Sequence, residues 1–142
     1  MKVYFGQLYI RPGINFPFSH IFQHYISEKV TALTFASAKF VQEYGEDFDL
    51  IFRMSAKEGL RQNEIRGPTV FRRTKDVEYS IFLPFDVIVG EPDVPRAALR
   101  YLFDGVCDVF NRLGIDRRQV AEASDSIIEQ VCSDPAMFKS PA

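Results

Sequence analysis

Alternating apolar and polar positions divide the first two thirds of the chain into short β-strands. Residues 2–10, KVYFGQLYI, are β-branched or aromatic on both alternating faces, a pattern typical of a strand covered on both sides near the centre of a sheet. Residues 48–54, FDLIFRM, predict a second strand. Two further strands are predicted at 69–74 and 77–83, joined by a polar turn. Within the last strand, the apolar face is expected to consist of Tyr79, Ile81 and Leu83.

The segments around these strands carry residues that interrupt pairing. Residues 55–68 are polar and contain Gly59 and Gly67, so they predict a loop. Pro84 has no backbone N–H to donate, and strand pairing is therefore expected to weaken there.

Apolar residues at three-to-four spacing predict a helix between the first two strands. Residues 18–44 show this spacing, either as one helix or as two pieces separated near 27–30. The run 29–35, KVTALTF, could instead be a strand. Gly45 stands where a left-handed residue commonly ends a helix.

The last third of the chain predicts two helices. Asp93 is a good N-cap, Pro95 is tolerated in the first turn, and Gly114 ends the first helix. Its apolar stripe is Leu99, Leu102, Phe103, Val106, Phe110 and Leu113. Asp116 caps the second helix with Gln119 as its capping-box partner. That helix is lined by Val120, Ala123, Ile127 and Val131, and the short link between the two helices favours an antiparallel pair.

These elements predict a single α+β domain with the order β-α-β-β-β-α-α. Strands that follow one another in a hairpin imply an antiparallel or mixed sheet with helices packed on it. A length of 142 residues is most economically one domain, 1–142. The hydrophobic share of 46% and charged share of 25% are ordinary for a globular protein and argue against disorder.

Composition also limits where in the cell the protein is expected and which classes of partner it is expected to bind. No segment has the roughly 18 apolar residues that span a bilayer, and the chain begins without the long apolar stretch of a signal peptide. We therefore expect a cytoplasmic protein with no membrane partner, in which Cys107 and Cys132 pack as small hydrophobes. The net charge of -2 predicts no direct nucleic-acid binding, although residues 53–85 carry seven basic and four acidic side chains.

One pair of histidines offers an enzymatic alternative. His20, His24 and Glu28 stand at i, i+4 and i+8 and would share one side of a helix. Two imidazoles could bind a metal with a carboxylate, or act as acid and base in a small hydrolase or nuclease. A solvated or core-edge pair is much commoner, and no HExxH motif supports the site. We predict no catalytic residue, metal or cofactor, and keep a hydrolase or nuclease using His20 and His24 as an alternative.

A basic and aromatic segment offers a second alternative. Phe71, Arg72 and Arg73 could form part of a sheet face that stacks and holds single-stranded RNA. Acidic residues in the same stretch, Glu64 and Glu78 among them, reduce the positive potential. Cross-strand pairing of Arg72 or Arg73 with Glu78 is the simpler expectation.

Acidic residues gather in two further groups. One group is Glu43, Glu46, Asp47 and Asp49. The other group, opposite the apolar stripe of the last helix, is Glu122, Asp125 and Glu129. The simplest interpretation is a solubilising surface. The sharper interpretation is an anionic patch that docks a basic protein, because such patches raise association rates and fix orientation.

The segment 64–86, EIRGPTVFRRTKDVEYSIFLPFD, resembles bacterial immunity proteins of contact-dependent growth inhibition and related polymorphic toxin systems. The resemblance lies in 67–69 (GPT), 76–79 (DVEY) and 82–85 (FLPF). It implies a non-enzymatic, cytoplasmic inhibitor that binds the C-terminal domain of a cognate toxin, often a nuclease with a basic cleft, and neutralises it.

The resemblance carries over no binding residue. The two acidic groups are the predicted partner-binding residues because of their charge alone. The toxin's identity, the surface used and the oligomeric state stay open.

Overall fold

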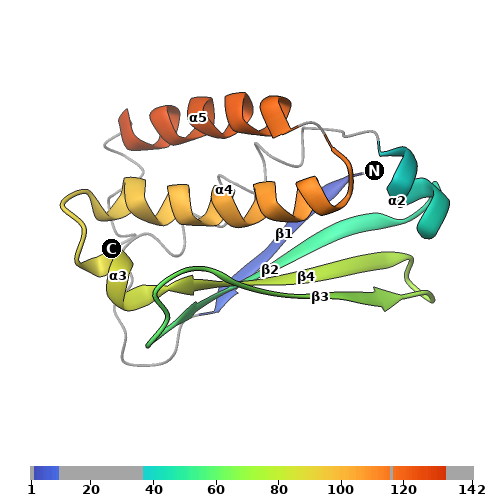
Figure 1. The fold of residues 1–142 in the computed structure, drawn as a ribbon, viewed down its shortest axis with the longest axis horizontal. Coiled ribbons are helices and arrows are strands. Elements are labelled where there is room, and N and C mark those ends of the chain that lie inside the picture. The colour runs from blue at the N-terminus through green and yellow to red at the C-terminus, as the bar shows by residue number, and fades with distance from the viewer. Residues whose placement is uncertain (1, 10–36, 116, 134–142) are drawn as a thin grey trace, which may run out of the picture.

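A mixed four-stranded sheet forms the base of the fold (Figure 1). The structure is a computed structural model and describes residues 2–9, 37–115 and 117–133. The strands lie in the order β1-β2-β4-β3. Their bounds are Val3–Tyr9 for β1, Asp49–Lys57 for β2, Glu64–Phe71 for β3 and Asp76–Pro84 for β4. β1 and β4 both run parallel to β2, and β3 is antiparallel to β4, so the predicted α+β class with a mixed sheet is confirmed.

One described helix lies between β1 and β2, and three follow β4. Apart from α3, this is the expected order. Their bounds are Ala38–Glu43 for α2, Phe85–Val89 for α3, Val94–Arg112 for α4 and Arg117–Ser133 for α5. Figure 1 shows α4 lying along one face of the sheet, with α5 packed beside α4 in the next layer. The two long helices confirm the predicted antiparallel pair.

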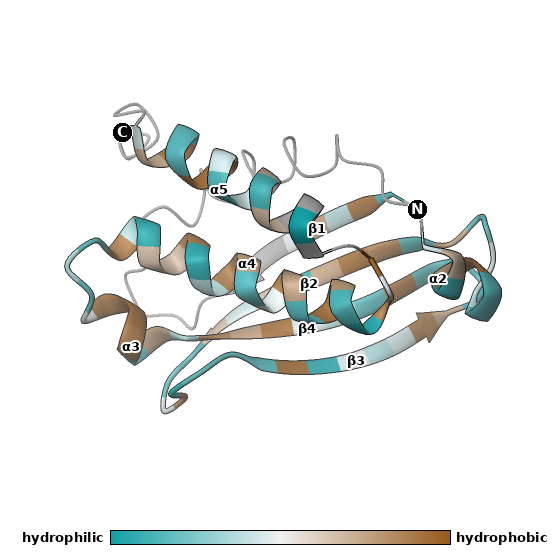
Figure 2. Cartoon of the chain, turned by 45° about the horizontal axis from the view of Figure 1, so that its top comes forward, coloured by the Kyte–Doolittle hydropathy of each residue, from teal (hydrophilic) through white to brown (hydrophobic). Residues whose placement is uncertain are grey.

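The core lies between α4 and the two central strands. Every second residue of β2 and β4 is buried, beginning at Leu50 and Val77, and Figure 2 shows the many hydrophobic positions of the two strands. The Phe52 ring meets the Phe110 ring of α4 edge-on, with centroids 5.8 Å apart. Burial of side chains of this size stabilises the fold by about 1.5–3 kcal/mol each. All members of the predicted α4 stripe are buried, namely Leu99, Leu102, Phe103, Val106, Phe110 and Leu113.

Side-chain caps begin α2 and α4, and a left-handed glycine follows the end of α4. The Asp93 carboxylate accepts a hydrogen bond from the Arg96 backbone N–H at 3.2 Å, and Gly114 has a left-handed φ of 71° after the last turn of α4. Both features were expected from the sequence. Ser37 accepts a bond from the Phe40 N–H at 3.1 Å and donates its hydroxyl to the Leu113 carbonyl. One buried serine therefore starts α2 and holds it against the end of α4.

The predicted position of the first strand is wrong. Among the described strands, β1 pairs with β2 alone and stands at one edge of the sheet, whereas the sequence placed it near the centre. Val3 and Phe5 are buried, but Tyr4 between them is 38% exposed. Tyrosine has an apolar ring and a polar tip and suits either environment, so an aromatic run does not by itself show that both faces are covered.

The third strand begins earlier than expected. β2 continues to Lys57 and β3 starts at Glu64, so most of the predicted loop 55–68 is strand, and β3 ends at Phe71 and not at 74. Gly67 and Pro68 suggested a loop, yet both are tolerated in an edge strand with a bulge. The register shift of β3 lies between Arg66 and Thr69.

Two further expectations have different outcomes, and one helix was not expected. Pro84 is the last paired residue of β4, which confirms the expected end of pairing. The apolar run 85–89 forms the short helix α3, which no pattern had predicted. Of the predicted helix 18–44, the part at Ala38–Glu43 is helical; residues 18–36 lie outside the described residues, as does the cap residue Asp116.

Gly67 occupies a position that only glycine fits well. Its φ is 127°, a value that residues with a Cβ rarely adopt. A Cβ placed there would lie 2.8 Å from the Glu78 carbonyl oxygen on the neighbouring strand. Gly59 also has a positive φ, 79°, but a Cβ there would meet nothing within 4 Å.

We therefore predict that Gly67→Ala lowers the free energy of unfolding by about 2–3 kcal/mol, because backbone strain and a backbone clash act together. Gly59→Ala is the matched control, since it adds strain without a clash and should cost about 1 kcal/mol. Urea unfolding followed by circular dichroism measures both. Equal losses for the two variants would show that the contact with Glu78 has no effect.

Candidate protein-binding surfaces

The first predicted acidic group lies along the connection that leads from α2 into β2. Glu43 ends α2, Glu46 and Asp47 lie in the following turn, and Asp49 opens β2. Glu43, Glu46 and Asp47 are exposed, and Asp49 is half-buried. We call these four residues the α2–β2 acidic patch.

The turn between β3 and β4 brings basic residues to the edge of this patch. The Lys75 ammonium lies 3.2 Å from an Asp47 carboxylate oxygen, and the Asp49 N–H donates to the Lys75 carbonyl at 3.0 Å. Arg72 and Arg73 are exposed in the same turn. The turn thus neutralises part of the patch.

Two tyrosines connect the acidic patch to the core. The Tyr44 ring packs between Phe40 and Phe48, with centroid distances of 5.0 and 6.2 Å. Burial and the neighbouring Glu43 carboxylate raise the pKa of Tyr44 to about 12. Burial also raises the pKa of Tyr79. Both phenols therefore stay protonated at neutral pH and can donate a hydrogen bond, but they supply no phenolate.

The second acidic group lies on a different layer of the molecule. Glu122, Asp125 and Glu129 are exposed on α5, which Figure 1 shows on the outer side of α4, whereas α2 stands at one end of the sheet. Glu129 forms an ion pair with Arg96 at the start of α4. The structure therefore does not join the two predicted groups into one surface.

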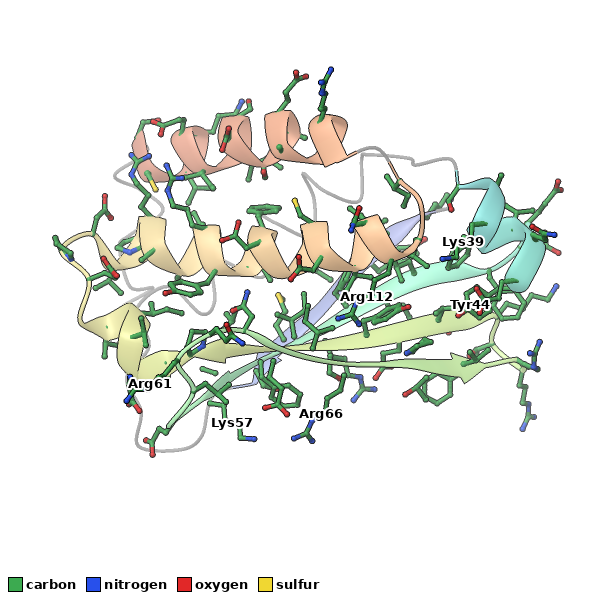
Figure 3. The ribbon with its side chains drawn as sticks, in the orientation of Figure 1. Lys39, Tyr44, Lys57, Arg61, Arg66 and Arg112 are labelled. Atoms are coloured by element: carbon green, nitrogen blue, oxygen red, sulfur yellow. The ribbon has the colours of Figure 1, made fainter. Side chains whose placement is uncertain are left out.

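On the side of the sheet that faces away from α4 and α5, sequence reasoning singled out as candidate binding residues only Phe71, in the RNA-binding alternative, and Asp49, in the first acidic group. This side is made of the strand residues that alternate with the buried ones, and we call it the open sheet face. Its members are Tyr4, Asp49, Ile51, Arg53, Ser55, Lys57, Glu64, Arg66, Thr69, Phe71, Asp76, Glu78, Ser80 and Phe82. Figure 3 shows Lys57 and Arg66 pointing away from the helices on this side.

Ion pairs join side chains of the open sheet face, two of them between strands and one within β3. Arg53 lies 2.8 Å from Glu78, and Glu64 lies 2.8 Å from Arg66 and 3.4 Å from Lys57. The hydrogen bond from Arg66 holds the pKa of Glu64 below its usual value. The predicted pairing of Arg72 or Arg73 with Glu78 is wrong, because both arginines lie beyond the end of β3 while Glu78 stands opposite Thr69.

An aromatic ring supports two of these cations. The Arg66 guanidinium lies 4.8 Å from the centroid of the Phe82 ring, and the Lys57 ammonium lies 5.6 Å from it. Such cation–π contacts contribute about 0.5–1 kcal/mol at exposed sites. Phe71, at one corner of the face, is 43% exposed, and Arg72 and Arg73 follow it, so the residues of the RNA-binding alternative do meet at that corner.

The described part of the structure does not include the residues of the enzymatic alternative. His20, His24 and Glu28 lie outside the described residues. Among residues 2–9, 37–115 and 117–133, no three His, Cys, Asp or Glu side chains are close enough to hold a metal ion. Cys107 and Cys132 are half-buried, and burial raises the pKa of Cys132, which suits a packing role.

No helix in the described part of the chain is both long enough and apolar enough to cross a bilayer. Comparison with protein-family models, with curated proteins and with solved structures gave no match.

The raised pKa of Tyr44 predicts a pH-dependent stability. Folding raises the pKa of this phenol from 10.0 to about 12, so the folded state holds the proton more tightly than the unfolded state. The stability is complete below about pH 10 and is lost as the pH rises toward about 12. Urea unfolding at about pH 9 and about pH 11.5 measures the loss of stability between the two pH values. This loss should be smaller in Tyr44→Phe than in the unchanged protein. Tyr4→Phe removes an exposed phenol and should leave the loss unchanged; an equal effect of both variants would contradict the assignment.

Proposed function

We propose that this protein is a non-enzymatic, cytoplasmic immunity protein that binds the C-terminal domain of a cognate toxin and neutralises it. The observation that supports the proposal is the α2–β2 acidic patch, in which Glu43, Glu46 and Asp47 stand exposed on one short connection. A toxin that cleaves nucleic acid has a basic cleft, which an acidic surface can cover and block.

The patch is mounted on ordered elements, and this favours tight binding. Ser37 holds α2 against the end of α4, and Phe48, directly before β2, is buried beneath the patch. The carboxylates on this connection therefore need little ordering when a partner arrives. Reduced ordering lowers the entropic cost of association.

The segment that resembles immunity proteins contributes to the same end of the molecule. It folds as the β3–β4 hairpin and continues into α3, and its turn places Lys75 against Asp47. In the proposed complex, Asp47 is already paired within the chain, so the remaining exposed carboxylates, Glu43 and Glu46, carry most of the attraction. The acidic face of α5 adds long-range steering and does not share this contact.

The function is tested first by growth. The proposal requires a large secreted protein encoded immediately upstream, and the probe is the variable C-terminal domain of that protein, produced in cells with and without this chain. We expect the domain to arrest growth alone and growth to continue when the chain is present. Growth arrest in both cultures, with both proteins produced, would refute neutralisation of that domain.

The surface is tested by charge reversal. Glu43→Lys together with Glu46→Lys should slow association with the same domain about tenfold at low salt and flatten its salt dependence, because steering depends on local charge. The Asp47–Lys75 pair is left intact, so the fold is preserved. Glu91→Lys with Asp108→Lys changes the net charge equally at two exposed positions elsewhere and should leave the rate within about twofold. Equal effects of the two pairs would remove the patch from the interface.

An RNA-binding module remains the second candidate, because Phe71, Arg72 and Arg73 meet at one exposed corner. Base stacking on an exposed ring with nearby guanidinium groups is the chemistry of single-strand binding. A gel shift with single-stranded RNA at physiological salt separates the two candidates, since the immunity hypothesis predicts no shift.

A further inference from the structure

The charges of the open sheet face are unequally presented to solvent. The Arg53 and Arg66 side chains are 67% and 60% exposed, whereas those of their partners Glu78 and Glu64 are 14% and 33% exposed. The carboxylates lie close to the sheet and the guanidinium groups stand above them. An approaching molecule therefore meets cations first, although the ion pairs themselves are neutral.

We propose that the open sheet face is a second interaction surface, which binds an acidic segment of a protein partner. The partner's carboxylates bind Arg53 and Arg66, and its apolar side chains pack on Tyr4 and Phe71. This surface shares Asp49 with the α2–β2 acidic patch but does not include Glu43, Glu46 or Asp47, and its existence does not depend on the toxin-binding proposal.

The two guanidinium groups are held in fixed places. Arg53 and Arg66 are both registered with Ser80, from opposite sides of β4, so their Cα atoms are two strand spacings apart, roughly 10 Å. Glu64 and the Phe82 ring fix Arg66, and Glu78 fixes Arg53. Each guanidinium has five N–H donors, so a pair with one carboxylate leaves donors for another. The face thus offers two ordered carboxylate-binding groups separated by a small serine.

The composition of the face favours protein over nucleic acid. Arginine and aromatic residues are enriched in protein interfaces, and Tyr4 and Phe71 are 38% and 43% exposed here. A nucleic-acid strand needs a run of cations that neutralises successive phosphates. On this face the three cations Arg53, Lys57 and Arg66 are already paired with Glu78 and Glu64, so the face does not offer the long run of cations that successive phosphates need.

The test is a titration of the isotope-labelled full chain, followed by NMR, with a decapeptide of alternating glutamate and tyrosine. We expect backbone amide shifts to cluster on β2, β3 and β4, and the matched peptide of alternating glutamine and tyrosine to give none. Arg53→Gln with Arg66→Gln should weaken binding at least about tenfold, because charge-assisted hydrogen bonds are lost. Arg100→Gln with Arg112→Gln is the control with the same charge change at exposed positions of α4, and should change the affinity less than about twofold.

Several outcomes would overturn the proposal. They are absence of shifts at millimolar peptide, shifts that cluster away from the three strands, and equal effects of the two double variants. A ten-nucleotide oligouridine that binds more tightly than the glutamate peptide at physiological salt would assign the face to nucleic acid instead. Glu43→Lys with Glu46→Lys should leave this titration unchanged, so failure here and failure of the toxin-binding proposal are separate results.

Discussion

The packing of α4 across the buried side of β2 and β4 is the contact on which the remaining structure depends. Gly105 allows the helix to come close, since a Cβ there would lie 2.9 Å from a methyl group of Ile81. Phe52 and Phe110 close the contact from the side of β2. The end of α4 in turn receives the Ser37 hydroxyl and the Lys39 ammonium, which donate to the Leu113 and Arg112 carbonyls. Displacement of α4 would therefore also release α2 and the acidic connection that follows it.

This contact also determines the chemistry of the opposite face. Side chains alternate between the two sides of a strand, so once Phe52 and Met54 are buried, Arg53 must stand on the other side. The same rule places Ser80 opposite the buried pair Tyr79 and Ile81. The charged face is thus a geometric consequence of the core, and its residues cannot move to another register without exposing apolar side chains.

Local patterns predicted what local interactions decide. The stripe and caps of α4 were found because both depend on residues within a few positions of one another. The placement of β4 between β2 and β3 was not found, because parallel pairing with β2 joins residues distant in sequence. Two ion pairs were missed for the same reason, because their partners are distant in sequence. Arg53 lies beside Glu78 only because β2 pairs with β4. Lys75 lies beside Asp47 only because the β3–β4 turn lies next to the start of β2. The acidic groups themselves were visible in sequence, but their neutralisation was not.

Local charge, and not the net charge of -2, governs how such a molecule meets its partners. At physiological ionic strength the screening length is about 8 Å, shorter than the width of a sheet whose four strands lie about 4.8 Å apart. A partner at the α2–β2 acidic patch therefore responds mainly to Glu43 and Glu46, and a partner at the open sheet face responds mainly to Arg53 and Arg66. Two charged surfaces can then act on one small fold without cancelling, because Glu43 and Glu46 stand on the connection before β2, whereas Arg53 and Arg66 stand within the sheet.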